Sequence, residues 1–332
     1  MITKSKDELI ARLKPAGFGF SEFQLVSEGH YETFDADWNY KDIPHLNALH
    51  KLVNSYPSSI DDFLVTSVNL QSVLGMVLPM IVVNYHSGKD RQTYYTSFLN
   101  LLLIVETHWR SLGPNQTRVE TSYAIGSRWY LRFLHPIVRH LITKNYRQLM
   151  SEDLPMRERR GQLRDWGYAY RTDGPVHSFA ATLHILEENM VVKHELAAAA
   201  PHVVTPAQLE EARTRDVLTT RSDHWGLRLR VADGALQIYP RMCPHEGACL
   251  DDQPVERGTV KCPWHGRLLR PLATIPYPFA PDAAPVELRH QRLVPSVAGL
   301  TIEFKDTPLA DKAEVASRLA RRIADDLTGV ST

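Results

Sequence analysis

Two short loops, each with one cysteine and one histidine, constrain the fold of this chain more than any other feature. The first loop reads CPHEG (243–247), and the second reads CPWHG (262–266). Proline stiffens each loop and glycine permits a tight turn, so both loops suit a fixed set of ligands. The pattern predicts one metal centre between the two loops, and its candidate ligands are Cys243, His245, Cys262 and His265.

The order of these four ligands separates two kinds of metal centre. Structural zinc sites usually have both cysteines first and both histidines second. Here the pattern is C-x-H (243–245), followed after a gap by C-x-x-H (262–265). Each loop can therefore give one thiolate to the first iron and one imidazole to the second iron of a [2Fe-2S] cluster. The interleaved order favours this cluster, and a structural zinc site is the alternative.

The segment around these loops, residues 217–305, resembles a Rieske domain of the ferredoxin and oxygenase type. The sequence CPWHGRLLRPL (262–272) is similar to the second cluster loop of that family. In the Rieske proteins of respiratory complexes, an additional cysteine in each loop forms a disulfide, but here the second loop has no spare cysteine. We therefore expect Cys249 to be a small buried residue and not a ligand. A Rieske cluster passes single electrons, so the resemblance implies a terminal acceptor.

The segment 1–190 combines strand-like stretches with one long helical region. Apolar residues alternate or run together over 61–75, 75–87, 91–113 and 116–127, with turn residues between the segments. Residues 132–167 repeat their apolar positions about every 3.6 residues, as an amphipathic helix does. We predict an α+β domain over 1–190, in which a sheet curls around the helix and encloses an apolar cavity. This arrangement is similar to the helix-grip (START-like) fold.

Three further segments follow this domain. Residues 191–216 are rich in alanine and in charge, and we predict a connector with a helix that starts at Thr205-Pro206. Short apolar segments separated by Asp-Gly, Pro and Gly predict a small all-β Rieske domain over 217–305. Residues 306–332 carry apolar side chains at helical spacing, which predicts a C-terminal amphipathic helix.

A second candidate metal site lies in the stretch NYKDIPHLNALH (39–50). Residues five apart on a regular helix point about 140° away from each other. One metal can therefore bind both His45 and His50 only if the helix is widened or the ligands reach around its start. The alternative is structural: Asp42 caps a helix, and the two histidines are half-buried residues of that helix.

The same stretch resembles the iron-binding motif of Rieske non-haem iron oxygenases, N-x-x-D-x-x-H-x-x-x-x-H. Every position of the motif is filled, by Asn39, Asp42, His45 and His50. The resemblance implies a mononuclear Fe(II) held by the two histidines and a later aspartate. Within EDLPMRE (152–158), Asp153 is the candidate and Glu152 is the substitute. The resemblance also implies catalytic roles for Asn39 and Asp42, with Asp42 connecting a cluster histidine to His45.

This resemblance implies a function and its partners. A ferredoxin or flavin reductase would supply electrons, and O2 would be activated for hydroxylation or oxidative modification of a small hydrophobic substrate. In the familiar oxygenases the Rieske domain precedes the catalytic domain, whereas here it follows. Electrons in the family cross between subunits, so the swapped order is compatible with a homo-oligomer, which by analogy is a trimer.

Two other functions remain open. The first is an electron-transfer protein in which the Rieske domain is fused to an iron-free, START-like binder of hydrophobic ligands. The second is a zinc-bound interaction module.

Composition and charge exclude several other classes of function. The 38 Lys and Arg residues balance the 38 Asp and Glu residues, so the chain has no basic field that would attract nucleic acid. The longest apolar runs, 73–83 and 98–105, are too short for a transmembrane segment. With no secretory signal and only three cysteines, the chain is expected to be cytoplasmic.

Two groups of side chains lie outside these motifs. Five aromatic residues are expected in the core or in the lining of the cavity, namely Tyr94, Tyr95, Trp109, Trp129 and Tyr130. Four arginines follow Asp153 and are expected on a solvated face, with docking of an electron donor as the alternative. These arginines are Arg157, Arg159, Arg160 and Arg164.

Overall fold

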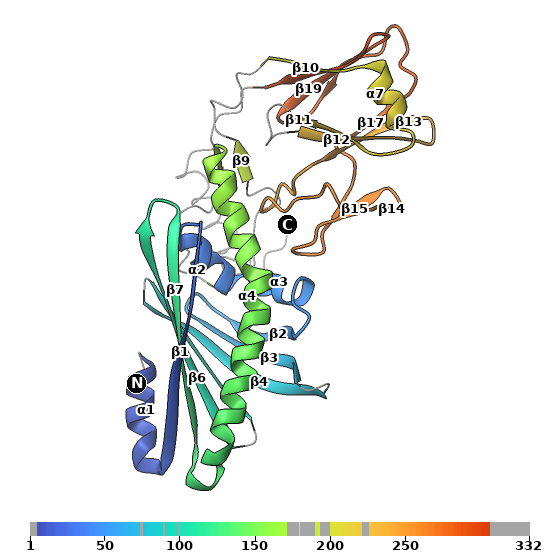
Figure 1. Ribbon diagram of the computed structural model, residues 1–332. Coiled ribbons are helices and arrows are strands. Elements are labelled where there is room, and N and C mark those ends of the chain that lie inside the picture. Colours follow the sequence, from blue (N-terminus) through green and yellow to red (C-terminus); the bar gives the residue numbers. More distant parts are fainter. Residues whose placement is uncertain are drawn as a thin grey trace, which may run out of the picture. The chain divides into compact units, whose positions relative to one another are not determined.

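The structure of the chain, a computed structural model, divides into two compact units (Figure 1). The first unit comprises Met1–Gln162 and Asp173–Ile185, and the second comprises Leu163–Thr172 and Leu186–Thr332. The structure describes residues 5–73, 76–88, 90–98, 100–170, 179, 190–192, 200–220 and 226–305.

A seven-stranded antiparallel sheet and a 31-residue helix form the first unit. The strand order is β1-β7-β6-β5-β4-β3-β2, so neighbours in the chain pair as hairpins and the first strand joins the last. The elements are α1 (Lys6–Leu13), β1 (Phe18–Gly29), α2 (Thr33–Lys41), α3 (Ile43–Ala48), β2 (Val53–Ile60), β3 (Leu64–Val73), β4 (Met76–Gly88), β5 (Arg91–Phe98), β6 (Leu101–Gly113), β7 (Gln116–Arg128) and α4 (His135–Asp165). The 3-10 helices are Lys14–Ala16 and Trp129–Leu134.

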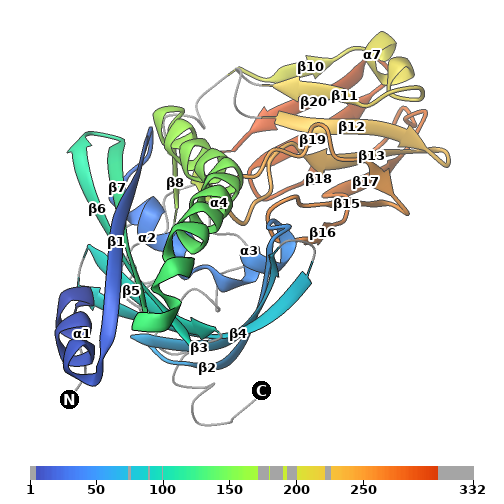
Figure 2. The same ribbon diagram turned by 60° about the horizontal axis from the view of Figure 1, so that its bottom comes forward.

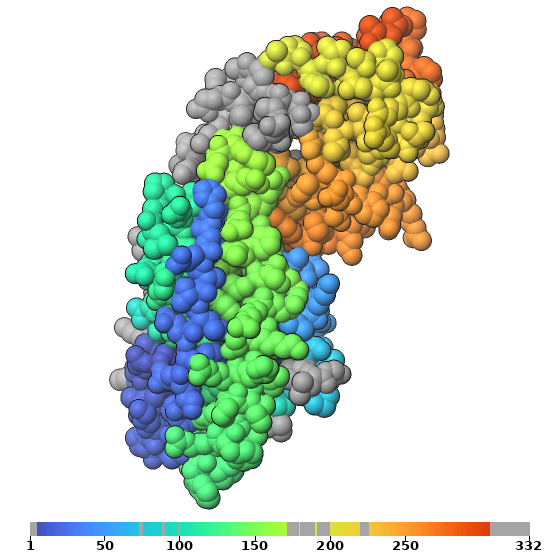
Figure 3. Space-filling view, in the orientation of Figure 1, coloured from blue at the N-terminus to red at the C-terminus, as the bar shows by residue number. Residues whose placement is uncertain are grey.

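The sheet curls around α4, which lies across its concave face (Figure 2). At 1.5 Å per residue, α4 is about 46 Å long and can follow the whole sheet. β1 and α4 lie side by side on one face (Figure 3). Here the Ser21 hydroxyl lies 2.7 Å from Nδ1 of His135, and the guanidinium of Arg139 lies 5.1 Å from the ring centre of Phe23. This helix-grip arrangement confirms the predicted fold of the first domain.

Local sequence explains the hairpins of this sheet. The β5–β6 and β6–β7 connections contain Asn100 and Asn115, whose φ angles are 63° and 53°. Asparagine accepts this left-handed conformation more readily than most residues, which permits short turns. On β7, Thr121, Tyr123 and Ile125 alternate toward one face, and all three line the cavity under α4.

The second unit is an assembly of small antiparallel sheets. Two four-stranded sheets have the orders β10-β20-β19-β18 and β11-β12-β13-β17, and smaller sheets contain β14-β15-β16 and β8-β9. The elements are β8 (Tyr168–Tyr170), β9 (Met190–Val192), β10 (His202–Val204), α7 (Pro206–Glu211), β11 (Val217–Thr220), β12 (Gly226–Ala232), β13 (Ala235–Pro240), β14 (Val255–Glu256), β15 (Thr259–Lys261), β16 (Leu268–Leu269), β17 (Ala273–Pro276), β18 (Val286–Glu287), β19 (Gln291–Ser296) and β20 (Gly299–Phe304). Leu229, Leu236, Ile238 and Leu300 are fully buried in its main core.

Part of the predicted connector belongs to this second unit. α7 starts where the sequence predicts, because the Thr205 hydroxyl caps it by accepting a hydrogen bond of 3.3 Å from the backbone N–H of Gln208. β10 pairs with β20, with Val204 opposite Leu300. The predicted C-terminal helix (306–332) lies outside the described residues.

Across the ranges that the structure describes, no helix has both the length and the apolar character that spanning a membrane requires.

Candidate metal centres and the adjoining cavity

Two loops of the second unit share the same hydrogen-bonding pattern. In the first loop, the N–H of Gly247 donates to the carbonyl of Cys243 (2.9 Å), and the N–H of Cys243 donates to the carbonyl of Ala248 (2.8 Å). In the second loop, the corresponding bonds run from Gly266 to Cys262 (2.9 Å) and from Cys262 to Arg267 (2.7 Å). Gly247 and Gly266 have φ angles of 84° and 67°, a region that favours glycine. The two halves of the predicted cluster site are therefore built alike.

The four candidate ligands of these loops form two pairs. The rings of His245 and His265 are 4.7 Å apart between centroids. The thiols of Cys243 and Cys262 are buried and hydrogen-bonded to each other, and this contact lowers the pKa of Cys262 to about 4 and raises that of Cys243. A thiol whose pKa is lowered suits a site that binds thiolates.

The geometry of these pairs fits two metal ions better than one. Four ligands of one tetrahedral zinc lie within about 4 Å of one another, given metal–ligand distances of about 2.0–2.3 Å. Among the described residues, one group of three His, Cys, Asp or Glu side chains has its ligand atoms within 4.8 Å of one another. That group lies in the first unit and contains none of the four cluster ligands. A cysteine pair and a histidine pair fit a [2Fe-2S] cluster, which takes one pair on each iron.

The first cluster loop is held by the segments that begin the second unit. The hydroxyl of Tyr170 donates to the carbonyl of Glu246 (3.4 Å), and the N–H of Met190 donates to the carbonyl of Pro244 (3.1 Å). A Cβ at Gly247 would lie 2.3 Å from Cδ1 of Leu163. The loop therefore depends on glycine for close packing as well as for its φ angle.

The prediction that Cys249 is buried is wrong, because this side chain is exposed. Met242 and Cys249 form an isolated antiparallel bridge, so side chains alternate in direction along this short extended stretch. The neighbours of Cys249, Ala248 and Leu250, point inward and are fully buried.

The second candidate centre lies in the first unit, where two helices and a loop meet. α2 ends at Lys41, α3 begins at Ile43, and Asp42 between them has a non-helical ψ of 80°. His45 is on α3, whereas His50 follows the end of that helix, so the two histidines do not share a regular helix. The divergence expected for two positions on one helix therefore does not apply. Asp42 occupies the N-cap position of α3, but its side chain makes no capping hydrogen bond.

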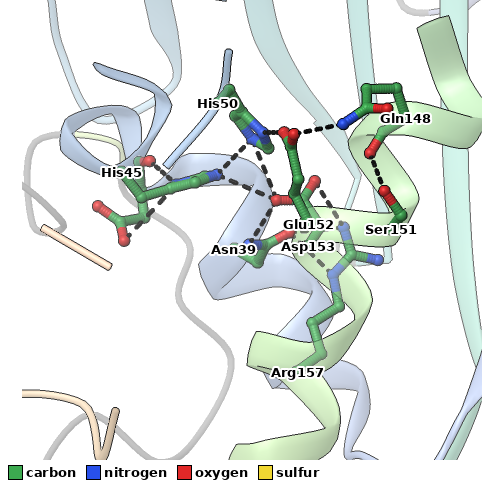
Figure 4. A network of polar contacts seen from close by, with 9 residues as sticks. Asn39, His45, His50, Gln148, Ser151, Glu152, Asp153 and Arg157 are labelled. Carbon is green, nitrogen blue, oxygen red and sulfur yellow. Dashed lines mark hydrogen bonds and ion pairs between the residues drawn. The ribbon is translucent and has the colours of Figure 1, made fainter. Parts of the chain in front are cut away.

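His45, His50 and Asp153 converge on one point (Figure 4). The Nε2 atoms of the histidines are 3.2 Å apart, and Oδ1 of Asp153 lies 3.3 Å from Nε2 of His45 and 3.1 Å from Nε2 of His50. Three donor atoms at these separations can all lie about 2.1 Å from one ion, a normal distance for a divalent transition metal. Two histidines and one carboxylate are the donor set of the non-haem iron facial triad, so the residues present fit Fe(II).

Outer contacts orient both imidazoles toward this point. Nδ1 of His45 hydrogen-bonds to the backbone carbonyl of Asp42, and Nδ1 of His50 lies 2.7 Å from Oε2 of Glu152. With their Nδ1 atoms so engaged, both rings present Nε2 to Asp153. Burial opposes a charge on His50, but its hydrogen bonds to Asp153 and Glu152 outweigh burial and raise its pKa. Glu152, the predicted substitute ligand, is therefore placed behind His50, and Asp153 faces the centre.

Asn39 and Arg157 hold the carboxylate of Asp153. The amide of Asn39 donates to Oδ1 of Asp153 (3.4 Å) and accepts from Nε (2.8 Å) and Nη2 (2.5 Å) of Arg157. Nη2 of Arg157 also lies 3.7 Å from Oδ2 of Asp153. Burial alone would raise the pKa of Asp153, but its hydrogen bonds with the histidines and the charge of Arg157 hold it well below its ordinary value. Asp153 is therefore an anion without a bound metal.

The predicted solvated face of arginines is wrong for two of them. Arg157 is 0% exposed and Arg160 is 1% exposed. Arg160 forms a buried ion pair with Asp35 (2.7 Å) and lies over the ring of Trp38. The sequence contained one signal for the role of Arg157, namely its position four residues after Asp153, where side chains on a helix meet.

Asp42 contacts His45 through its backbone. Its carboxylate oxygen Oδ2 lies 3.7 Å from Nδ1 of His45, beyond hydrogen-bonding distance, while its carbonyl accepts from that atom. Asp42 is 1% exposed.

A cavity of about 400 Å³ adjoins the triad, between α4 and the concave face of the sheet. Its lining is mainly apolar and comes largely from β4 to β7 and α4, whereas β3 contributes Asn69 and Gln71. His45, His50 and Asp153 lie in its wall. Tyr94 lines the cavity, and Tyr95 and Trp109 pack in neighbouring core clusters, as expected. The same prediction is wrong for Trp129 and Tyr130, which are exposed on the turn before α4. A volume of this size accommodates a small organic ligand.

Comparison with known proteins identifies one domain of the chain. Residues 202–274 match the family described as Rieske [2Fe-2S] domain, and the chain therefore contains a Rieske domain, which carries electrons on a [2Fe-2S] cluster. The match begins before residue 217 and includes β10 and α7. No curated protein sequence matches the chain.

Solved structures resemble part of the chain at low identity. The di-domain ARO/CYC BexL from the BE-7585A biosynthetic pathway is 12% identical, with a TM-score of 0.39, over 46% of this chain and 54% of that one. A START superfamily protein from Mycobacterium smegmatis is 11% identical, with a TM-score of 0.37, over 44% and 99%. Dicamba monooxygenase bound to 3,6-dichlorosalicylic acid is 10% identical, with a TM-score of 0.34, over 44% and 51%. The chain thus spans about half the length of the first and third of these proteins.

Proposed function

We propose that the chain is a Rieske-type non-haem iron oxygenase. The observation that carries the proposal is the convergence of His45, His50 and Asp153 in the wall of an apolar cavity, in a chain that also contains a Rieske domain. A buried site with three donor atoms and a cavity beside it has room for both O2 and an organic substrate. The Rieske domain supplies the single electrons that O2 activation needs.

Each candidate residue has a distinct part in this proposal. Cys243 and Cys262 would hold one iron of the cluster, and His245 and His265 would hold the other. His45, His50 and Asp153 would hold a mononuclear Fe(II), which when bound supplies the open positions at which O2 is activated.

The surrounding residues prepare the mononuclear site before any metal binds. Although burial opposes the charge, hydrogen bonds with the two histidines and the charge of Arg157 keep Asp153 ionised. Asn39 donates to Oδ1 of Asp153, the oxygen that faces the histidines. Glu152 and the carbonyl of Asp42 accept from the Nδ1 atoms, which leaves the Nε2 atoms available as ligands. The apolar cavity wall excludes bulk water and favours a small hydrophobic substrate.

The proposal includes partners that act outside this chain. A ferredoxin or flavin reductase would reduce the cluster, in the cytoplasm. Copies of the chain would assemble as a homo-oligomer, by analogy a trimer, in which the cluster of one copy supplies the iron of its neighbour. Asp42, which is buried beside His45, would take part in that electron path.

The alternative function is an electron-transfer protein with an iron-free binding domain. The mainly apolar lining of the cavity favours it, because such a wall binds hydrophobic ligands with or without a metal.

Iron and acid-labile sulfide content separates the two functions. The oxygenase predicts roughly three irons and two sulfides per chain, and about two irons in His45→Ala. His108→Ala, which changes a half-exposed histidine on β6 away from the triad, is the matched control and should keep all of its iron. Two irons per chain in the wild type, unchanged in His45→Ala, would establish the alternative.

A further inference from the structure

A polar band crosses four strands of the cavity wall, and other polar side chains line the cavity at Asn69, Gln71, Thr96, Asn145 and Tyr146. Asn84 on β4 pairs with Tyr94 on β5, Tyr94 pairs with Val105 on β6, and Val105 pairs with Tyr123 on β7. These residues form one row across four strands, and because paired positions share a face of the sheet, both tyrosines point into the cavity they line. The next row along the strands is also polar, and it contains Gln92, Thr107 and Thr121.

The two tyrosines of this band have unused hydrogen-bonding capacity. Neither the Tyr94 hydroxyl nor the Tyr123 hydroxyl makes a hydrogen bond with the described part of the chain. Thr107 and Thr121, by comparison, are satisfied by each other (3.4 Å). A phenol in a mainly apolar cavity is costly to leave without a partner, so the two hydroxyls favour a ligand that supplies one.

The polar band is on the same side of the cavity as the triad. The side-chain amide of Gln92 donates to the carbonyl of Tyr40 (3.4 Å), and Tyr40 follows Asn39, which contacts Asp153. Farther along β5 and β6, the lining is apolar and includes Phe98, Leu101 and Leu103. The polar band therefore lies near the triad, and large apolar side chains line the cavity farther along these strands.

No lysine or arginine side chain lines this cavity in the described part of the chain. Among the described residues that line it, the single carboxylate is Asp153. An anion bound at the polar band would therefore be desolvated with no lysine or arginine to pair with it. The cavity thus selects against carboxylates and sulfonates.

We propose that the cavity binds an uncharged, largely apolar molecule that carries a hydroxyl or carbonyl oxygen, and that the hydroxyls of Tyr94 and Tyr123 donate hydrogen bonds to this oxygen. The proposal refines the substrate class of the proposed function and rests on it for the statement that the ligand is a substrate. Burial raises the pKa of both tyrosines, so they remain protonated donors over the physiological range. The apolar region beyond them receives the body of the ligand.

Binding of three matched probes to the full-length protein tests this subsite. Equilibrium dialysis under argon, without reductant, would measure the dissociation constants of pyrene, 1-acetylpyrene and pyrene-1-carboxylate. The ketone should bind roughly tenfold more tightly than pyrene, the value of about one hydrogen bond to an otherwise unpaired buried donor. The carboxylate should bind more weakly than pyrene.

Substitutions in the polar band assign the preference to the tyrosines. The double variant Tyr94→Phe/Tyr123→Phe should bind pyrene as the wild type does and should lose the tenfold preference for the ketone. Tyr95→Phe is the matched control, because Tyr95 packs in a core cluster with Ile104 instead of lining the cavity, and it should keep the preference. The subsite is refuted if the carboxylate binds as tightly as the ketone, if the double variant keeps the preference, or if neither neutral probe binds.

The experiment does not depend on the mononuclear iron. The same measurement on His45→Ala should show the same order of affinities. If iron analysis refutes the oxygenase and the ketone preference survives, the subsite belongs to a binding domain. If iron is present and the preference is absent, the subsite alone fails.

Discussion

Arg157 and Asp153 offer a direct test of how the triad is held. Nη2 of Arg157 lies 3.7 Å from Oδ2 of Asp153, and the arginine is fully buried. With an effective dielectric constant of about 20, two unit charges at this distance attract each other by about 4.5 kcal/mol. Desolvation of both groups offsets part of this attraction, so we expect a coupling free energy of about 2–3 kcal/mol, the upper part of the range for contacting residues.

A double-mutant cycle measures this coupling. Arg157→Met keeps most of the apolar stem of the side chain but removes its charge, which leaves Asp153 without its buried cation. This variant should lower the free energy of unfolding by about 3–5 kcal/mol. Asp153→Asn removes the other charge, and the double variant should cost about 2–3 kcal/mol less than the sum of the single variants. Urea unfolding of metal-free protein, followed by far-UV circular dichroism, provides the values. Arg159→Gln, on a half-exposed neighbour, is the control and should change stability by less than about 0.5 kcal/mol. A coupling below about 0.5 kcal/mol would refute the view that Arg157 holds Asp153 in place.

Three further predictions follow from particular contacts. Cys262→Ser should abolish the visible absorption of the cluster, while Cys249→Ser, at the exposed cysteine, should leave it intact. If both variants keep the wild-type absorption, Cys262 is not a cluster ligand. Gly247→Ala should lower the cluster content, because residue 247 has a φ of 84° and the new Cβ would lie 2.3 Å from Leu163. Gly234→Ala is the control, since residue 234 has a φ of 71° but open space around it, and it should lower the free energy of unfolding only by the left-handed strain of about 1–2 kcal/mol. Burial alone would raise the pKa of Glu106, but its hydrogen bonds with His108 and the backbone N–H of Lys6 outweigh burial and lower the pKa. Ionised Glu106 therefore stabilises the fold above its unfolded pKa of about 4.3. This contribution is lost as the pH falls through the lower pKa of the folded state. In urea titrations from pH 5 to pH 3, Glu106→Gln should therefore lose less stability than the wild type, and parallel pH profiles would contradict this role.

The sequence was sufficient to predict the central elements of the fold. Apolar periodicity located strands β3 to β7 and the helix α4, because these segments are long and amphipathic, and periodicity is most reliable in such segments. β1 and β2 were not predicted, since most of their residues are only partly buried or exposed, and Pro57 and three serines interrupt the apolar pattern of β2. The Thr205 cap was predicted correctly because capping is a local interaction.

Properties that depend on tertiary contacts were beyond the sequence. The motif 39–50 resembled a single helix, but the chain bends at Asp42 and α3 ends before His50, which allows both histidines to face Asp153. Arg157 and Arg160 resembled a solvated face because their partners, Asn39 and Asp35, lie far away in the chain. The exposure of Cys249 depends on the direction of one bridge in a short loop, and no periodic pattern encodes it.

Electron paramagnetic resonance of one reduced sample tests the central claim most directly, because it can detect both iron environments. Protein reduced by dithionite and then exposed to nitric oxide should show the signal of the reduced [2Fe-2S] cluster together with a second signal from nitric oxide bound to a mononuclear ferrous iron. We predict that His45→Ala and Asp153→Ala lose the second signal and keep the first. A wild-type protein with a full cluster signal and no nitrosyl signal, or a nitrosyl signal of equal size in both variants, would contradict an iron held by these residues.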